Sequence, residues 1–203
     1  MKKIILVGSG GHSKSCIDVI KLNEKYIIAG FVVENNHQKI KNNLDYPIVG
    51  EDNDLERLRK EYDHALVTVG QIKSAKTRYL LFNKLKKLNY NLPIIISPRS
   101  YVSNESRIKE GTIIMHDVLI NSKAQIGKNC IINSKSLIEH DSLIGDHCHI
   151  ATSAVVNGNV KVGFKSFIGS GSILNNSITV GNNCIIGSGQ IIKKNIKSKS
   201  LIK

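Results

Sequence analysis

An aliphatic residue recurs every six positions through the second half of the chain, and this period restricts the possible fold more than any other feature. The run has no miss and no insertion. A period of six fits neither the turn of an α-helix nor the alternation of a long strand, but it fits a short strand followed by a corner. The sixteen positions are Val102, Ile108, Ile114, Ile120, Ile126, Ile132, Ile138, Ile144, Ile150, Val156, Val162, Ile168, Leu174, Val180, Ile186 and Ile192.

Three such sides would close a triangular coil, in which residues 18 apart stack about 4.8 Å above one another. The fourth residue after each aliphatic one is usually small, and Cys130, Cys148 and Cys184 occupy this position. We therefore expect these cysteines to be buried spacers and not reactive thiols. Six glycines directly follow the aliphatic residue, where we expect a turn to use their conformational freedom. They are Gly127, Gly145, Gly163, Gly169, Gly181 and Gly187.

Composition bears on the possible partners. The net charge is +13, from 29 Lys and Arg against 16 Asp and Glu, but the lysines are spread along the chain and aromatic residues are only 5%. A solvated, lysine-rich surface is favoured over nucleic-acid binding, which needs clustered cations. The positive field also suits a polyanionic small molecule such as a nucleotide or coenzyme A. No C-x-x-C pair is present, and we expect no metal.

The apolar runs are short. None reaches the roughly 18 residues that a membrane span needs, and the first strand meets Gly8 too early for a secretion signal. We expect a cytoplasmic protein without a membrane partner.

The first hundred residues differ in pattern from the repeats. Residues 3–7 read as a strand, 8–12 as a glycine loop, and 13–22 as a helix with Ser13 as its N-cap. Further strands are expected at 27–33, 64–69 and 94–96, and helical stretches near 52–61 and 74–88. We predict a small Rossmann-like βαβ domain over residues 1–98, followed by a parallel β-helix over residues 99–203.

The glycine loop suits phosphate, because a helix N-terminus presents free backbone N–H groups. The dinucleotide signature G-x-G-x-x-G is incomplete, with Ser13 where its third glycine belongs. A tight turn without a ligand remains the alternative.

One histidine of the repeats stands beside an acid at a corner. Counted from Ile138, His140 and Asp141 are the third and fourth residues of their hexad, so both side chains can project outward together. The carboxylate would orient the imidazole and make it a better base. Gly158 lies 18 residues later, one coil above His140, where a missing side chain leaves room for a thioester and a backbone N–H could hold an oxyanion.

Other candidates lie on other sides of the coil. Strand alternation points His149 outward onto a flat face, and the 18-residue step links Ser170 and Ser188 on another edge. We expect His147 and His116 to be solvated surface residues.

The segment I-E-H-D at 138–141, followed by I-G-D-H-C-H at 144–149, resembles the bacterial hexapeptide-repeat sugar acetyltransferases. This family includes UDP-4-amino-sugar N-acetyltransferases and sialic acid O-acetyltransferases. The resemblance implies a left-handed β-helix, a homotrimer with active sites between subunits, and acetyl-CoA as co-substrate. It makes His140 the base, supported by Asp141, and places His149, Gly158, Ser170 and Ser188 against acetyl-CoA.

The first domain also resembles this family, in which it holds the nucleotide-linked sugar. The G-x-x-G-H loop and a later glycine match its substrate site, and of the family's paired acids after the second strand only the second is kept, at Val33-Glu34. The implied substrate-binding residues are Gly10, Gly11, His12, Glu34 and Gly70. The C-terminal G-x-P-A-K segment of the family is missing.

The expected function is acetyl-CoA-dependent N-acetylation of a nucleotide-linked 4-amino-4,6-dideoxysugar for surface glycan biosynthesis. O-acetylation of sialic acid, and a non-catalytic β-helix scaffold, remain open as alternatives.

Overall fold

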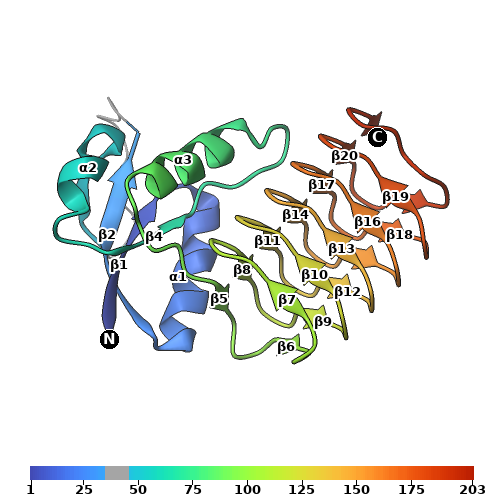
Figure 1. Ribbon diagram of the computed structural model, residues 1–203, viewed down its shortest axis with the longest axis horizontal. Coiled ribbons are helices and arrows are strands. Elements are labelled where there is room, and N and C mark those ends of the chain that lie inside the picture. Colours follow the sequence, from blue (N-terminus) through green and yellow to red (C-terminus); the bar gives the residue numbers. More distant parts are fainter. Residues whose placement is uncertain (35–45) are drawn as a thin grey trace. The chain divides into compact units, whose positions relative to one another are not determined.

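The computed structural model describes residues 1–34 and 46–203, which form two compact units. The N-terminal unit contains residues 1–70 and 76–93, and the β-helix unit contains residues 71–75 and 94–203. Each unit is described by itself (Figure 1). No helix in the described parts of the chain is long and apolar enough to cross a membrane.

The N-terminal unit is built on a four-stranded parallel sheet with the order β3-β2-β1-β4. Its apolar side chains, among them Ile5, Val32 and Leu85, form one buried cluster. The Rossmann-like βαβ prediction is confirmed. The elements are β1 (Lys2–Val7), α1 (Gly11–Asn23), β2 (Tyr26–Val33), β3 (Ile48–Glu51), the 3-10 helix η1 (Asp52–Asp54), α2 (Leu55–Leu58), β4 (His64–Val67) and α3 (Lys76–Lys87).

Helix α1 begins two residues earlier than expected. Its N-cap is Gly10, in an extended conformation and without a side-chain cap. Ser13 lies inside the first turn, where its hydroxyl donates a hydrogen bond of 2.5 Å to the Gly10 carbonyl. The prediction of Ser13 as the N-cap is therefore wrong, because its hydroxyl bonds backward to a carbonyl instead of accepting from the free N–H groups.

The β-helix unit is a left-handed parallel β-helix of two-residue strands, as predicted. Three lateral sheets make its sides: sheet I has the order β22-β20-β17-β14-β11-β8-β5, sheet II β21-β18-β15-β12-β9-β6, and sheet III β19-β16-β13-β10-β7. Consecutive strands of a sheet pair at a step of 18 residues, as Ile138 does with Val156.

The strands of this unit are β5 (Ile95–Ile96), β6 (Tyr101–Val102), β7 (Arg107–Ile108), β8 (Ile113–Ile114), β9 (Leu119–Ile120), β10 (Gln125–Ile126), β11 (Ile131–Ile132), β12 (Leu137–Ile138), β13 (Leu143–Ile144), β14 (His149–Ile150), β15 (Val155–Val156), β16 (Lys161–Val162), β17 (Phe167–Ile168), β18 (Ile173–Leu174), β19 (Thr179–Val180), β20 (Ile185–Ile186), β21 (Ile191–Ile192) and β22 (Leu201–Ile202).

The two ends of the β-helix depart from the expected pattern. Strand β5, expected in the first domain, pairs with β8 and so opens the β-helix. At the other end Ile185 pairs with Leu201, a step of 16 residues, so the last coil is shorter. The prediction for β5 is wrong because its short apolar run carries no mark that distinguishes a sheet strand from the first side of a coil.

The interior of the coils is filled as predicted by the aliphatic residues and the small spacers. Cys130, Cys148 and Cys184 are each 0% exposed. Burial raises the pKa of the Cys148 thiol, which stays protonated and donates to the Gly163 carbonyl at 3.0 Å. These cysteines are spacers, as expected.

The six glycines after the aliphatic residues have a different role from the expected one. None has a positive φ. Added Cβ atoms would instead collide with the next coil, 2.4 Å from Asp146 Oδ1 at Gly127 and 2.4 Å from the Gly187 carbonyl carbon at Gly169. These glycines therefore permit the close approach of stacked coils.

The left-handed backbone conformation occurs two residues further on, at the corners from residue 111 to residue 189. Every sixth residue in this range has a φ near +60°, and most of these residues are not glycine. They are Gly111, Asp117, Lys123, Asn129, Lys135, Asp141, His147, Ser153, Asn159, Lys165, Gly171, Ser177, Asn183 and Gly189.

Candidate active site

His140 and Asp141 form a close pair at the corner after β12, between sheets II and III. The imidazole Nδ1 lies 2.8 Å from Asp141 Oδ2, and the two side chains are 58% and 52% exposed. Asp141 adopts the left-handed conformation with φ 59°, which aspartate tolerates better than most residues. The structure thus confirms that both side chains project outward together.

Gly158 lies one coil above His140, as expected from the 18-residue step. The Asn159 N–H donates to the His140 carbonyl at 2.9 Å. An added Cβ on Gly158 would lie 2.7 Å from His140 Nε2. The space at Gly158 is therefore taken by the imidazole ring, so the prediction that it is room for a thioester is wrong.

The backbone N–H of Gly158 remains a candidate donor to an oxyanion. Its N–H donates no hydrogen bond to any residue that the structure describes. The N–H group next to the imidazole can therefore serve an incoming acceptor, such as a developing oxyanion.

Glu139 is a member of this corner that sequence reasoning missed. Its Oε2 accepts hydrogen bonds from the Asn121 side-chain amide at 2.9 Å and from the His140 N–H at 3.3 Å. Asn121 precedes Glu139 by 18 residues, so the coil register could have revealed the pair. The carboxylate ties the backbone of His140 to the coil below.

His149, on β14 of sheet I, points outward but is only 7% exposed. Its Nδ1 lies 2.5 Å from the carbonyl oxygen of Gln71, and its ring packs edge-to-face on Phe167 at 5.2 Å. His149 points outward as expected, but the face is covered at this position, because Gln71 lies against the ring.

His147 and His116 were expected to be solvated, and this is wrong for His147. It is 4% exposed, its Nδ1 lies 2.9 Å from the amide nitrogen of Asn129, and its ring packs edge-to-face on Phe164 at 5.4 Å. The left-handed corner turns this side chain back along the coil, against the residue 18 positions earlier.

His116 and Asp117 repeat the histidine–acid sequence on the corner between sheets I and II. There the acid forms an ion pair with Arg99 at 3.0 Å, and the imidazole lies 2.7 Å from the hydroxyl of Ser97. Both members are engaged within the fold, so this second pair is structural, in contrast to the exposed pair at His140.

Ser170 and Ser188 are exposed on that same corner between sheets I and II. His140 stands on the corner between sheets II and III, and His149 on sheet I. One chain therefore does not bring His140 together with His149 or with the two serines.

The glycine loop of the N-terminal unit contains two kinds of glycine. Gly8 has φ +106°, and an added Cβ there would lie 2.5 Å from Val69 Cγ2, so the fold itself requires glycine. Gly10 and Gly11 are exposed, and an added Cβ would meet no atom within 4 Å. Nothing in the fold demands glycine at these two positions, which leaves open space before the N-terminus of α1, where an anionic group is favoured.

His12 and Gly70 lie together beside this loop, because a Cβ on Gly70 would make an ordinary contact of 3.5 Å with His12 Cβ. The His12 Nε2 lies 3.4 Å from Cys16 Sγ. Burial raises the pKa of Cys16 to about 12, so the thiol stays protonated, and the tautomer of His12 decides which of the two groups donates. Glu34 is exposed at the end of β2, at the same carboxyl edge of the sheet.

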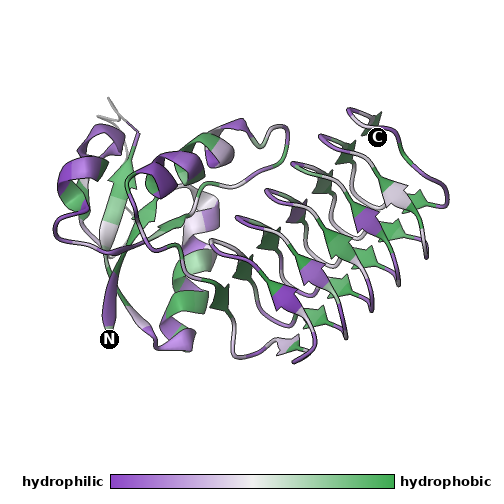
Figure 2. Cartoon of the chain, in the orientation of Figure 1, coloured by the Kyte–Doolittle hydropathy of each residue, from purple (hydrophilic) through white to green (hydrophobic). Residues whose placement is uncertain are grey.

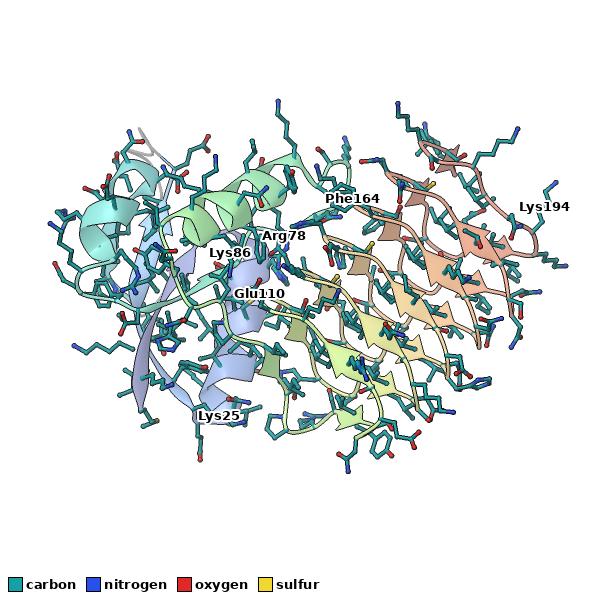
Figure 3. The ribbon with its side chains drawn as sticks, in the orientation of Figure 1. Lys25, Arg78, Lys86, Glu110, Phe164 and Lys194 are labelled. Carbon is teal, nitrogen blue, oxygen red and sulfur yellow. The ribbon has the colours of Figure 1, made fainter. Side chains whose placement is uncertain are left out.

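Arg78 is a second residue that sequence reasoning missed (Figure 3). It is 1% exposed, and its Nη1 donates to the carbonyls of Val67 at 2.6 Å and Val69 at 3.0 Å. The guanidinium thereby fixes the turn that leads from β4 to Gly70. An arginine in an otherwise amphipathic helix gives no sequence signal of such burial.

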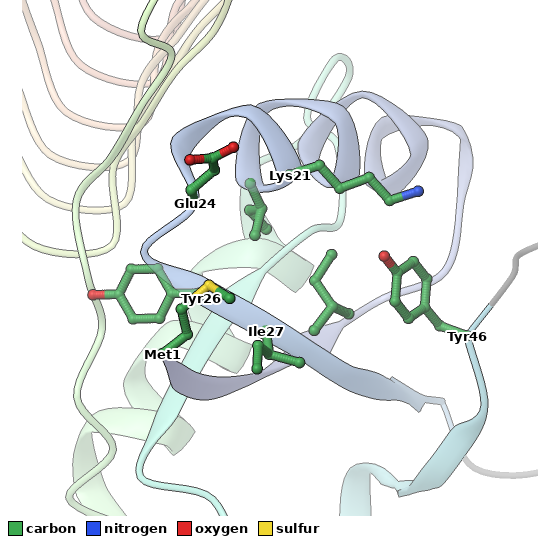
Figure 4. Close-up of a pocket in the computed structure, with 8 residues that line it drawn as sticks. Met1, Lys21, Glu24, Tyr26, Ile27 and Tyr46 are labelled. Atoms are coloured by element: carbon green, nitrogen blue, oxygen red, sulfur yellow. The ribbon is translucent and has the colours of Figure 1, made fainter.

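A hollow of about 390 Å³ lies elsewhere in the N-terminal unit (Figure 4). Met1, Lys21, Glu24, Tyr26 and Tyr46 are among the residues that line it. It opens at the amino ends of β1 and β2, whereas the glycine loop follows the carboxyl end of β1. No predicted site residue lines this hollow.

Both units match known families. Residues 3–85 match the PglD N-terminal domain, and residues 123–158 match the bacterial transferase hexapeptide, a model of six repeats. No curated protein sequence matches the chain.

Solved structures are similar over nearly the whole chain. A mutant of perosamine N-acetyltransferase from Caulobacter crescentus, in complex with CoA and GDP-perosamine, is 27% identical with a TM-score of 0.91, covering 99% of this chain and 93% of that chain. The acetyltransferase domain of PglB from Neisseria gonorrhoeae, in complex with acetyl coenzyme A, is 25% identical with a TM-score of 0.87, covering 97% and 93%. WeeI from Acinetobacter baumannii, 20% identical with a TM-score of 0.74 over 99% and 96%, shares the fold.

Proposed function

Because this chain is a hexapeptide-repeat acyltransferase of the sugar acetyltransferase family with a PglD N-terminal domain, we propose that it acetylates a nucleotide-linked 4-amino-4,6-dideoxysugar with acetyl-CoA. The observation that carries this proposal is the exposed pair of His140 and Asp141, with the imidazole ring next to Gly158. The product would serve surface glycan biosynthesis.

The chemistry follows from the geometry of this corner. With Nδ1–H donating to Asp141, the Nε2 of His140 is the atom that takes a proton from the sugar amine as its nitrogen attacks the thioester carbonyl. The N–H of Gly158 stabilises the oxyanion of the tetrahedral intermediate. Collapse of the intermediate forms the amide and expels the CoA thiolate, which takes the proton from the imidazolium.

Acetyl-CoA is assigned to the β-helix unit. His149, Gly158, Ser170 and Ser188 are its proposed contacts, and two of the similar structures were determined with CoA or acetyl coenzyme A. The exposed hydroxyls of the two serines supply hydrogen-bonding groups one coil apart.

The sugar is assigned to the loop of the N-terminal unit, with Gly10, Gly11, His12, Glu34 and Gly70 as proposed contacts. The open space at the two exposed glycines supports a phosphate-bearing substrate there. The perosamine enzyme was crystallised with a GDP-linked amino sugar, which favours a nucleotide sugar over free sialic acid.

A homotrimer is proposed because sheet II carries an apolar stripe along its outer face. Five of the six outward residues are aliphatic and the sixth is a tyrosine, whereas the outer face of sheet III is mostly polar (Figure 2). They are Tyr101, Leu119, Leu137, Val155, Ile173 and Ile191, of which Tyr101 is 62% and Ile191 58% exposed. Such a continuous stripe is typical of a surface that another protein covers.

The trimer would also complete the site. The corner of His140 and the corner of Ser170 and Ser188 are the two edges of sheet II. In a cyclic assembly around this sheet, the corner between sheets II and III of one copy approaches the corner between sheets I and II of the next. The active sites are therefore proposed to lie between subunits, in an enzyme that works in the cytoplasm.

The test is release of free CoA from acetyl-CoA in the presence of UDP-, dTDP- and GDP-linked 4-amino sugars, with sialic acid as the competing acceptor. We expect turnover with at least one nucleotide-linked amino sugar. Turnover of sialic acid alone would replace the proposal with O-acetylation.

A further inference from the structure

Gln71 stands outside the repeats in sequence, yet it is part of the β-helix unit. It is 3% exposed. Its carbonyl oxygen lies 2.5 Å from His149 Nδ1, and its side-chain amide nitrogen donates to the His147 carbonyl at 3.0 Å. One residue thus holds both the imidazole of His149 and the backbone two residues before it.

These contacts determine which nitrogen of His149 carries the proton. A carbonyl oxygen can only accept, so Nδ1 is the donor. On the other side Nε2 lies 3.5 Å from the amide nitrogen of Asn133, whose own oxygen accepts the Ser134 N–H at 2.8 Å. The amide nitrogen therefore faces the ring, and Nε2 is an acceptor in the neutral imidazole.

The buried side-chain amide of Gln71 is only partly satisfied by hydrogen bonds. Its Oε1 is buried and has no hydrogen-bond partner among the residues that the structure describes. The amide cannot turn over, because the His147 carbonyl would then face an oxygen. The amide therefore satisfies the His147 carbonyl and leaves its own oxygen unpartnered, and such exceptions are expected at functional sites.

We propose that Gln71 is a positioning residue, which holds His149 as the Nδ1–H tautomer so that Nε2 accepts a hydrogen bond from an N–H or O–H group of the acyl-CoA, which replaces the 3.5 Å contact with Asn133. This inference rests on the proposed function, in which His149 contacts that co-substrate. Gln71 directly follows Gly70, which is a proposed contact of the sugar.

The tautomer is measured directly by side-chain nitrogen-15 NMR of the full-length protein, with the His149 signals assigned by their loss in His149→Gln. We expect a protonated Nδ1 in the wild type. Gln71→Leu keeps the backbone carbonyl that accepts from Nδ1 but loses the side-chain bond to the His147 carbonyl that holds this backbone in place, so we expect a mixture of tautomers in this variant. Ile72→Ala is the matched control, because Ile72 is 64% exposed in the same segment, and it should leave the spectrum unchanged. A protonated Nε2 in the neutral wild-type ring overturns the proposal.

Kinetics then separate positioning from a merely structural role. We expect Gln71→Leu to raise the KM for acetyl-CoA about tenfold, the lower end of the range found for residues that orient a metal-binding histidine, with the KM for the sugar nearly unchanged. The double variant with His149→Ala should bind acetyl-CoA no worse than His149→Ala alone. A lower Tm with unchanged KM values would overturn the positioning role.

Failure of the proposed function would look different. A wild-type protein that transfers acetyl to no amino sugar refutes the reaction, but the tautomer and the affinity for acetyl-CoA, measured by calorimetry in wild type and Gln71→Leu, still decide the role of Gln71.

Discussion

His140 is the residue on which the proposed chemistry depends. It is largely exposed and held in the fold through its backbone and through Asp141. We expect His140→Ala to lower kcat/KM roughly 10²- to 10⁴-fold, the usual contribution of a general base, with almost no change in Tm. His116→Ala is the control, because His116 has the same hexad position and an adjacent acid but an imidazole engaged by Ser97.

The comparison is made by steady-state acetyl transfer and by thermal unfolding of both variants. Equal activity of His140→Ala and wild type would remove His140 from the mechanism.

Substitutions at Gly158 and Gly169 are expected to affect different properties, activity at the first and stability at the second. A methyl group at Gly158 meets the tip of the His140 ring, which can move aside, so Gly158→Ala should lose activity and keep its stability. A methyl group at Gly169 meets the backbone of Gly187 at 2.4 Å, so Gly169→Ala should lose about 1–3 kcal/mol of unfolding free energy. Urea unfolding and kcat give the two readouts. Equal stability losses in both variants would contradict this distinction.

At the scale of elements, helix α1 contains a buried group that makes stability depend on pH. Burial raises the pKa of Cys16 from 9.0 to about 12. As the pH rises, the unfolded chain therefore loses the thiol proton before the folded chain does. The stability that depends on the protonated thiol is complete below pH 9 and is lost as the pH rises from 9 to about 12.

We expect the free energy of unfolding to fall with pH over this range, and to fall less steeply in Cys16→Ala. Urea unfolding at several alkaline pH values measures both slopes. Parallel slopes in the two proteins would show that Cys16 does not contribute.

The regular elements could be predicted from the sequence, because an unbroken period of six defines both the buried positions and the 18-residue register. The same register placed His140, Asp141 and Gly158 on one edge. The handedness could not be derived, since parallel crossovers are normally right-handed, and came from the resemblance alone.

The contacts between distant segments could not be predicted. His149 is covered by Gln71, which is 78 residues away in sequence, and no periodicity reports such a contact. The glycines of the repeats were misread because a sequence shows where a turn falls, but not how closely the next coil approaches it. Strand β3 was missed because its four residues include Gly50 and have no clear alternation.

At the scale of the whole molecule, the apolar stripe of sheet II decides whether the chain acts alone. Ile173→Asp places a charge on this stripe without touching the coil interior. We expect this variant to be a folded monomer with little activity, because its candidate corners would no longer meet those of another copy. Thr179→Asp, on the exposed face of sheet III, should remain trimeric and active.

Analytical ultracentrifugation gives the assembly state, and circular dichroism checks the fold. A fully active Ile173→Asp monomer would refute an active site between subunits.

The corners have a further consequence for how such proteins diversify. The corners from residue 111 to residue 189 repeat one backbone conformation, and the side chains next to it project from the coil at fixed intervals. Two substitutions at such a corner can install or erase a histidine–acid pair while the backbone stays as it is. His116 and Asp117 have the same corner geometry on a different edge of the β-helix, where both side chains are now engaged in structural contacts. Exchange of a few side chains at such a corner would therefore be enough to create a new reactive centre on the same scaffold.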